Sequence, residues 1–241
     1  MSLQGKTVLI TGGAVRVGRS LALAVAGRGA DVVIHYRGSI EQAESLRSEV
    51  QAIGKTAHLL QADFRKPIKA KQLVSRALNF GPLYAVINNA AIFEPLTLEN
   101  TKLEAWEEHL AINLTAPFML SQAFAATLPP GEAGRIVNIL DWRATRPGCD
   151  HLPYTISKAA LAALTRSLAV ALAPRISVNG LALGAILPAD EGIDSFYHLE
   201  EIPAGRWADR EEVTQALIFL LDGPAYITGE IIHVDGGRHL I

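Results

Sequence analysis

The stretch DWRATRPGCDHLPYTISK holds a carboxylate, a phenol and an ammonium group, at Asp141, Tyr154 and Lys158. Tyr154 and Lys158 are four residues apart at the start of an alanine-rich helical run, so they lie on one face of the expected helix. A free tyrosine has a pKa of about 10, and a nearby ammonium group lowers it by roughly 1–3 units. Such a phenol can donate a proton to a reducible group near neutral pH. A tyrosine–lysine pair alone is common on helix surfaces, so its meaning depends on the rest of the chain.

The elements that would position these residues alternate along the chain. Short apolar, β-branched runs indicate strands at residues 6–13, 31–37, 56–64, 83–91, 134–140, 175–183 and 229–237. Helical spacing indicates helices at 17–30, 39–54, 67–81, 106–128 and after Tyr154, with Gly54 as a C-terminal cap. Continuous apolar strands that are each followed by a helix predict an α/β fold, a doubly wound parallel sheet with helices on both faces.

Residues 184–212 are the least regular part of the chain, rich in Gly, Pro and charge. This composition predicts a loop over a site, in which Tyr197 and His198 are candidates for selectivity. Trp142 and Trp207 either line a substrate pocket or pack in the core.

The composition is that of one soluble domain over residues 1–241. The hydrophobic share is 49% and the formal net charge is −2, so the chain carries no electrostatic footprint for nucleic acid or an anionic membrane. We find no signal-peptide pattern and no apolar run of about 18 residues, and we expect a cytoplasmic protein. The single Cys149 excludes an internal disulfide, and the histidines show no ligand spacing, so no metal site is expected.

A glycine-rich segment, TGGAVRVGRS, follows the first expected strand and opens a helix. Gly12 and Gly13 permit a tight turn and a close approach of the backbone to a pyrophosphate, and Gly18 lets the helix pack on the sheet. The N–H groups and the positive dipole end of a helix N-terminus favour phosphate. A plain strand-to-helix turn is the alternative, but the position directly after the first strand favours dinucleotide binding.

The end of the second expected strand indicates which dinucleotide the chain binds. NAD-binding units place an acid there for the ribose 2′-hydroxyl, whereas this chain has IHYRGS, with Arg37 and Ser39. Together with Arg16 of the glycine loop, these residues would receive a 2′-phosphate through charge-assisted hydrogen bonds, so we expect NADPH rather than NADH. The alternative for Arg37 is a solvated surface position. Asp63, which follows the third strand, either meets the adenine or forms a turn.

The motifs TGGAVRVG, NNAA, INLTAPF, YTISK and ITGEIIHVDGG resemble, in this order and over essentially the whole chain, the short-chain dehydrogenase/reductase family. The resemblance implies one Rossmann-like domain with about seven strands. It also implies a homotetramer, packed through the helix that contains Trp106 and the helix after Tyr154.

The resemblance implies roles for single residues as well. Tyr154 would donate the proton, Lys158 would hold the nicotinamide ribose and tune Tyr154, and Asn113 would hold a water in the proton relay. Asn88 and the backbone around Ala90 would border the cofactor. The full set of implied cofactor-binding residues is Gly12, Arg16, Val17, Gly18, His35, Tyr36, Arg37, Ser39, Asp63, Phe64, Asn89, Ala90, Tyr154, Lys158, Gly184 and Ile186.

One position departs from the general family pattern. The family normally has a serine thirteen residues before the tyrosine, where this chain has Asp141. A serine hydroxyl can donate a hydrogen bond to a ketone oxygen, whereas an ionised carboxylate can only accept one. The chain resembles here the pteridine reductases of the family, which carry an Asp at this position, an Arg in the glycine loop, HYxxS after the second strand and a phenylalanine after NNA. Arg16, HYRGS, Asp141 and Phe93 match that pattern, and the ending DGGRHL resembles the bacterial dihydromonapterin reductases. Ala91 differs, because some pteridine reductases have a serine there.

A dihydropterin suits these residues. Its N5=C6 imine accepts hydride at carbon and a proton at nitrogen, and Phe93 either stacks on the ring or is plain core. Asp141 would hydrogen-bond Tyr154 and relay protons, and Arg16 would reach both a cofactor phosphate and the pterin. The expected substrate-binding residues are therefore Arg16, Phe93, Asp141 and Tyr154.

We therefore expect an NADPH-dependent reductase of a dihydropterin such as dihydromonapterin or dihydrobiopterin. One alternative is a carbonyl reductase for an acyl thioester, a sugar or another ketone, in which Asp141 is a substitution without a catalytic role. The other is a catalytically silent dinucleotide-binding protein.

Overall fold

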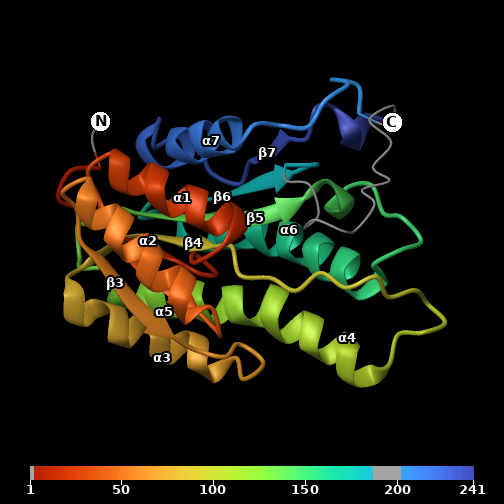
Figure 1. The fold of residues 1–241 in the computed structure, drawn as a ribbon, viewed down its shortest axis with the longest axis horizontal. Coiled ribbons are helices and arrows are strands. Elements are labelled where there is room, and N and C mark those ends of the chain that lie inside the picture. The colour runs from red at the N-terminus through yellow and green to blue at the C-terminus, as the bar shows by residue number, and fades with distance from the viewer. Residues whose placement is uncertain (1–2, 187–201) are drawn as a thin grey trace.

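The computed structural model describes residues 3–186 and 202–241, and a single parallel sheet forms its centre (Figure 1). Its strands are β1 (Thr7–Ile10), β2 (Asp31–Tyr36), β3 (Ala57–Gln61), β4 (Leu83–Asn88), β5 (Gly134–Asp141), β6 (Ile176–Leu183) and β7 (Ile231–Val234). They are arranged in the order β3-β2-β1-β4-β5-β6-β7, and every neighbouring pair is parallel. The predicted doubly wound α/β fold is confirmed.

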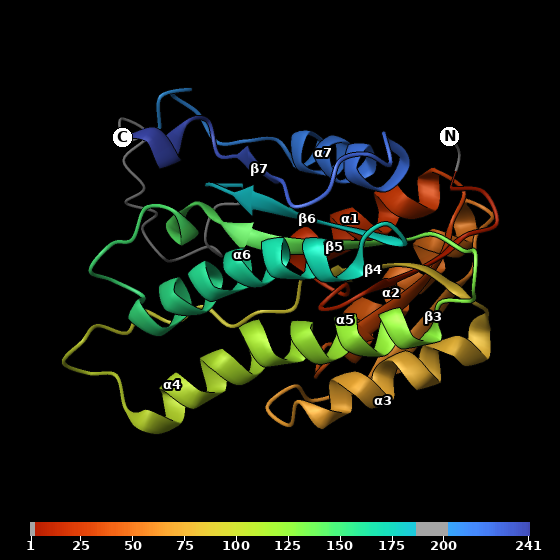
Figure 2. The same ribbon diagram turned by 180° about the vertical axis from the view of Figure 1, so that it is seen from behind.

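Helices cover both faces of the sheet (Figures 1 and 2). One face carries α1 (Arg16–Gly27), α2 (Ile40–Ala52) and α7 (Arg210–Asp222), and the other carries α3 (Ile68–Ala77), α4 (Leu103–Leu110), α5 (Ala116–Thr127) and α6 (Leu152–Leu172). Within β1, Val8 and Ile10 pack against the first layer and Leu9 against the second, because successive side chains of a strand point to opposite faces. All three are fully buried, which explains why this run of the strand is apolar at every position.

The strand order reverses between β1 and β4, since the chain winds from β1 towards β3 on one side and from β4 towards β7 on the other. Loops diverge at such a point and leave a crevice outside the carboxyl ends of the strands. Thr11, directly after β1, ties the two loops together at this edge. Its N–H donates to the Ile87 carbonyl oxygen (3.0 Å), and its hydroxyl oxygen accepts the N–H groups of Asn89 (2.9 Å) and Ala90 (3.0 Å).

Two helices differ in detail from the sequence-based expectation. The helix expected at residues 106–128 begins at Leu103 and contains a π-helical turn, Ala111–Thr115, between α4 and α5. The helix expected after Tyr154 begins at Leu152, which places Tyr154 within its first turn.

Helix α7 was missing from the sequence-based expectation, which placed its first residues in the irregular segment. Its start is marked by a capping box, in which the side chains of Asp209 and Glu212 each accept a hydrogen bond from the other residue's backbone. An Asp followed three residues later by a Glu, before an apolar run, is the signal that could have found this helix. Tyr197 and His198 lie outside the described residues.

Two helical segments, Leu103–Thr127 and Leu152–Leu172, are long and apolar enough to cross a membrane by length and composition alone. This is weak evidence for a membrane span, because core helices of globular proteins pass the same test. Both segments pack within the α/β fold, and they carry the buried polar residues Asn113 and Lys158.

Candidate active site

The three residues of the initial motif meet at the carboxyl end of β5. Asp141 is the last residue of β5, and Tyr154 lies in the first turn of α6. The Tyr154 hydroxyl donates to Asp141 Oδ2 at 3.0 Å, and Asp141 Oδ1 accepts the backbone N–H of Arg143 at 2.9 Å. Burial raises the pKa of the Asp141 carboxyl, while the Arg143 N–H and guanidinium group, Tyr154 and Lys158 act in the opposite direction. The Asp141 carboxyl group is thus positioned to accept a hydrogen bond from the Tyr154 hydroxyl.

Lys158 lies one helical turn beyond Tyr154, with only 3% of its surface exposed. Its Nζ donates to the Ile139 carbonyl oxygen at 2.7 Å and lies 5.6 Å from the centre of the Tyr154 ring. Burial lowers the pKa of Lys158 to about 8, against an opposing contribution from Asp141. The structure therefore brings Asp141, Tyr154 and Lys158 together, while their catalytic roles stay predictions.

Asn113 lies in the π-helical turn, a local irregularity that is frequent at functional sites. Its side-chain oxygen accepts the Ile92 N–H (2.9 Å), and its Nδ2 donates to the Ile92 carbonyl oxygen and to Ser157 Oγ (both 3.0 Å). Ser157 in turn donates to the Tyr154 carbonyl oxygen (2.7 Å). These contacts fix the loop after β4 and the first turn of α6, so Asn113 is a positioning residue. The relay water that the resemblance implies for it stays a prediction.

The glycine loop after β1 is shaped by close packing. Gly12 has a φ of +60°, and a Cβ there would come within 2.9 Å of Ala90 Cα. A Cβ on Gly18 would come within 2.1 Å of the Gly12 carbonyl oxygen. Any side chain at these positions would displace the backbone, so this cradle requires glycine. The backbone can therefore approach a bound pyrophosphate closely.

His35, at the end of β2, holds this loop in place. Its Nδ1 accepts the Gly12 N–H at 3.1 Å, which assigns the remaining ring proton to Nε2, 3.2 Å from the Ala62 carbonyl oxygen. The ring also stacks on Phe64, with 4.1 Å between centroids. Burial lowers the pKa of His35 to about 4, so the ring is neutral near pH 7 and remains able to accept.

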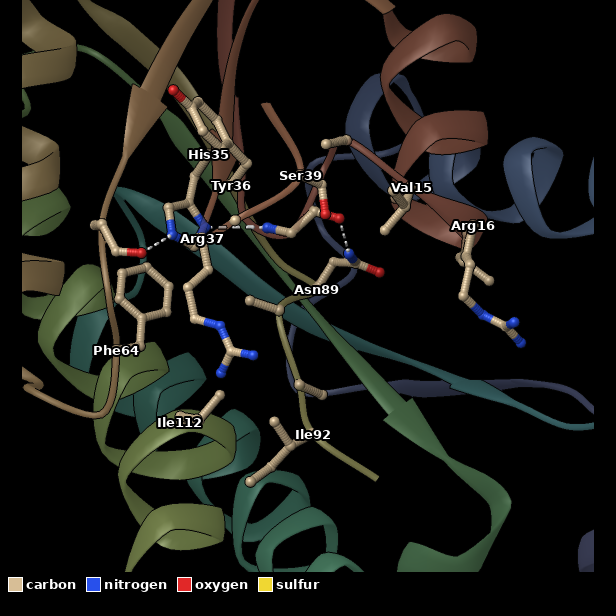
Figure 3. A pocket seen from close by; sticks show the side chains of 18 of the residues that line it. Val15, Arg16, His35, Tyr36, Arg37, Ser39, Phe64, Asn89, Ile92 and Ile112 are labelled. Carbon is tan, nitrogen blue, oxygen red and sulfur yellow. Dashed lines mark hydrogen bonds between the residues drawn. The ribbon is translucent and has the colours of Figure 1, made fainter. Parts of the chain in front are cut away.

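Two adjoining hollows lie along the crevice. The larger, of about 520 Å³, follows the glycine loop and the end of β2 (Figure 3). The smaller, of about 220 Å³, surrounds Asp141 and Lys158, and both hollows are bordered by Arg16 and Tyr154. The larger hollow is lined by Gly12, Arg16, Val17, Gly18, His35, Tyr36, Arg37, Ser39, Phe64, Asn89, Ala90 and Tyr154, and the smaller adds Lys158, Gly184 and Ile186. Every residue of the implied cofactor-binding set except Asp63 therefore borders one of them, whereas Asn88, which was also expected to border the cofactor, borders neither.

Asp63 and Asn88 border neither hollow, and Asp63 shows the second of its two expected roles. Asp63 Oδ1 accepts the Arg65 N–H (3.1 Å) and Oδ2 accepts Arg65 Nε (2.9 Å), so the turn role is the one observed. The Arg65 guanidinium lowers the pKa of this carboxyl. Asn88 is buried and donates to Asn138 Oδ1 (2.7 Å), because its side chain points into the core rather than the crevice. Its neighbour Asn89 borders both hollows.

The two guanidinium groups expected at the 2′-phosphate do not lie together. Figure 3 shows Arg37 extending towards Phe64 and Ile112, whereas Arg16 points away from it on the opposite side of the labelled residues. Arg16 has a φ of +50° and borders the smaller hollow as well. Arg37 and Ser39 line the larger hollow only, whereas Arg16 lines both hollows, and their roles at a phosphate stay predictions.

The smaller hollow has an aromatic and cationic wall. Phe93 is 46% exposed, so it is a lining residue and not core. Trp142 and Trp207 also line this hollow. The guanidinium carbons of Arg143 and Arg238 lie 4.7 Å and 4.3 Å from the centre of a Trp142 ring. Sequence reasoning assigned neither arginine to the site, although Arg143 lies in the stretch DWRATRPGCDHLPYTISK and Arg238 in the ending DGGRHL, because their contacts with Trp142 depend on the fold.

The chain is similar to known proteins over its whole length. A family model described as enoyl-(acyl carrier protein) reductase matches residues 13–239. The chain is 32% identical to a 3-oxoacyl-[acyl-carrier-protein] reductase from Synechocystis over 98% of both chains. It is 34% identical to the corresponding reductase of Aggregatibacter actinomycetemcomitans over 96% of this chain and 98% of the other.

Solved structures give the same similarity in three dimensions. The FolM alternative dihydrofolate reductase 1 from Brucella canis, complexed with NADP, superimposes with a TM-score of 0.92 and 32% identity, over 100% of this chain and 97% of that chain. A short chain dehydrogenase from Burkholderia cenocepacia in complex with NADP gives a TM-score of 0.93 and 34% identity over 99% of both chains.

Proposed function

The chain belongs to the short-chain dehydrogenase/reductase family and is an NADPH-dependent oxidoreductase, and from this premise we propose that it reduces a dihydropterin, such as dihydromonapterin or dihydrobiopterin, to the tetrahydro form. The observation that carries the proposal is the hydrogen bond from the Tyr154 hydroxyl to Asp141 Oδ2. It places a carboxylate where a carbonyl reductase needs a hydrogen-bond donor.

The residues of the crevice fit the cofactor. The backbone at Gly12 and Gly18 leaves no room for a Cβ, and α1 begins directly behind it, so a pyrophosphate would meet free N–H groups. Arg37 and Ser39 border the same hollow, where they would hold the 2′-phosphate. When bound, NADPH supplies the hydride. The protein contributes position and proton transfer.

Asp141 decides which substrates the site favours. An ionised carboxylate accepts hydrogen bonds and repels the negative charge that develops on a carbonyl oxygen. It can instead accept N–H groups, which a reduced pterin ring carries along its edge. Because burial raises the pKa of Asp141, its protonated form is more accessible than in water, which suits a group that relays a proton to Tyr154. The acceptor of that proton would be the imine nitrogen.

Purified protein tests the proposal directly. NADPH oxidation is followed by absorbance with dihydromonapterin, dihydrobiopterin and dihydrofolate, and in parallel with a 3-oxoacyl thioester and simple ketones. Turnover confined to the dihydropterins, and abolished by Tyr154→Phe, supports the proposal. Turnover only with the carbonyl compounds overturns it.

A second candidate, reduction of an acyl thioester ketone, is favoured by the names of the curated relatives, which are 3-oxoacyl-[acyl-carrier-protein] reductases. It requires another residue to donate to the ketone oxygen in place of a serine. The variant that tests this candidate is Asp141→Ser. The rate of 3-oxoacyl reduction should rise if the wild type lacks a hydrogen-bond donor to the ketone oxygen. It should stay unchanged if Asp141 is a substitution without a catalytic role.

We propose, as the family resemblance implies, that the protein is a cytoplasmic homotetramer. The apolar residues Leu103 on α4 and Val170 on α6 are 66% and 83% exposed, and Phe118 on α5 is also exposed. These helices are the ones expected to pack between subunits. Light scattering after size-exclusion chromatography should give four times the mass of the chain, and Val170→Glu should reduce it.

A further inference from the structure

Phe93 has a second aromatic ring against it. The His151 ring stacks face to face on Phe93, with 3.9 Å between centroids and 8° between planes. Tyr154 meets Phe93 edge to face, at 4.6 Å and 77°. Phe93 and Tyr154 line the smaller hollow, whereas His151 does not. His151 therefore contacts Phe93 without itself lining the hollow.

The backbone at His151 is unusual. Its φ and ψ are 54° and 41°, in the left-handed region that is unfavourable for a non-glycine residue. His151 is the N-cap of α6, but its side chain forms no cap hydrogen bond. Capping therefore does not account for this conformation, which directs the ring onto Phe93 instead.

Hydrogen bonds hold the backbone next to both rings. The Asn113 amide holds Ile92, next to Phe93, and the Leu152 N–H, next to His151, donates to the Leu96 carbonyl oxygen at 2.7 Å. The Phe93 loop and the start of α6 are thus joined on both sides of the stacked rings.

A hydrogen-bonded link fixes the His151 ring as well. His151 Nδ1 lies 2.7 Å from Asp150 Oδ2, and the same oxygen accepts Arg143 Nη2 at 2.9 Å. Arg143 is buried, and its backbone N–H donates to Asp141. The link therefore runs from the carboxylate of the site to the ring that stacks on Phe93.

We propose that His151 is a positioning residue for substrate, which holds Phe93 in place as the aromatic wall on which a dihydropterin stacks. The inference rests on the proposed function. Without the His151 ring, the half-exposed Phe93 would have several rotamers to lose on binding, and ordering one such side chain weakens binding by a few-fold. Because this cost falls on substrate binding, KM should change and kcat should not.

The experiment compares three variants with the wild type. His151→Asn removes the ring but keeps a residue that tolerates the left-handed conformation. His151→Phe keeps a stacked ring and removes the link to Asp150. His58→Asn is the matched control, because His58 stacks on Phe80 with almost the same geometry (3.8 Å, 4°) but lines neither hollow. The readouts are kcat and KM for dihydrobiopterin, and the Kd of fluorescent biopterin for the protein–NADP⁺ complex. Melting temperatures identify any variant that fails to fold.

We expect His151→Asn to raise both KM and the biopterin Kd about 3- to 10-fold, the range for one aromatic pair, with kcat changed less than about twofold. His151→Phe should restore most of the loss, and His58→Asn should match the wild type. An unchanged Kd in folded His151→Asn overturns the inference, as does an equal loss in His151→Phe. If the wild type reduces neither dihydromonapterin, dihydrobiopterin nor dihydrofolate and does not bind biopterin, the proposed function fails and the inference fails with it.

Discussion

Replacing Lys158 by methionine should stabilise the fold while removing turnover. Lys158 is the one ammonium group among the described residues for which burial lowers the pKa to about 8, from 10.5 in water. At about 1.4 kcal/mol per pKa unit, the charged form costs the folded protein about 3 kcal/mol at neutral pH. Methionine has a similar length and carries no charge, so it escapes this cost.

The substitution also removes a hydrogen bond. Lys158 Nζ donates to the Ile139 carbonyl oxygen at 2.7 Å, and leaving that buried oxygen without a partner costs about 1–2 kcal/mol. The expected net gain in unfolding free energy at about pH 7 is therefore about 1–2 kcal/mol. For a chain of this size, that corresponds to a rise of about 3–6 °C in Tm.

The pH dependence separates this cause from better packing. Between pH values of about 8 and 10.5, the unfolded wild type keeps a proton on Lys158 that the folded protein has released, so the contribution of this group to stability rises with pH. Methionine does not titrate. The advantage of Lys158→Met should therefore be largest near neutral pH, shrink above pH ~8 and reverse by pH ~10.5.

Thermal melts of the cofactor-free protein at about pH 7 and pH 10 measure both quantities. Lys71→Met, which replaces an exposed lysine on α3, is the control for methionine itself. A Lys158→Met variant that melts below the wild type at neutral pH, or whose advantage is the same at both pH values, refutes the reasoning. NADPH oxidation by the same preparations should be absent in Lys158→Met and normal in Lys71→Met.

Three further outcomes are expected. Asp141→Ser should lower kcat for a dihydropterin about 10- to 100-fold, because Tyr154 loses a charged acceptor, and leave the NADPH Kd within about threefold; loss of NADPH affinity measured by fluorescence titration would contradict this. Arg37→Ala should weaken NADPH binding about 10- to 100-fold and leave NADH binding unchanged, so equal losses for both dinucleotides would remove Arg37 from the 2′-phosphate. For His35, whose pKa burial lowers from 6.5 to about 4, the contribution to stability is complete above pH 6.5 and is lost as the pH falls towards 4. Urea unfolding at about pH 7 and pH 5 should show this loss in the wild type, with a smaller loss in His35→Gln.

The sheet was predictable because its central strands are buried on both faces. The run Val8–Ile10 of β1 must then be apolar, and the helices between such strands must cross over with one hand. The meeting of Asp141 with Tyr154 was predictable for a similar reason, because a strand end and a helix start at fixed spacing converge on the same edge of a parallel sheet.

Side-chain direction was not predictable from spacing. Arg16 sits in the glycine loop, but its positive φ turns it away from Arg37. Asn88 ends β4, and Asn89 begins the loop after it. Asn88 points into the core because it donates to Asn138 on β5, and Asn89 faces the crevice, where it donates to the Thr11 carbonyl oxygen. These contacts depend on how the strands pair in the sheet. Arg238 reaches Trp142 across the fold, a contact that no local pattern encodes.

The irregular features of the molecule bear on whether it is a catalyst at all. Both non-glycine residues with positive φ among the described residues, Arg16 and His151, lie at or against the walls of the two hollows, and so do the buried Lys158 and the π-helical turn of Asn113. A positive φ costs such a residue roughly 1–3 kcal/mol, and a charged buried lysine costs about as much. A protein that only bound the dinucleotide would need the glycine loop, Arg37 and Lys158, which is expected to hold the nicotinamide ribose, whereas an apolar residue in place of the buried Asp141 would make it more stable. The buried carboxyl group of Asp141 thus lowers stability beside Tyr154, the residue expected to donate the proton, and this favours a catalyst over a silent binding protein.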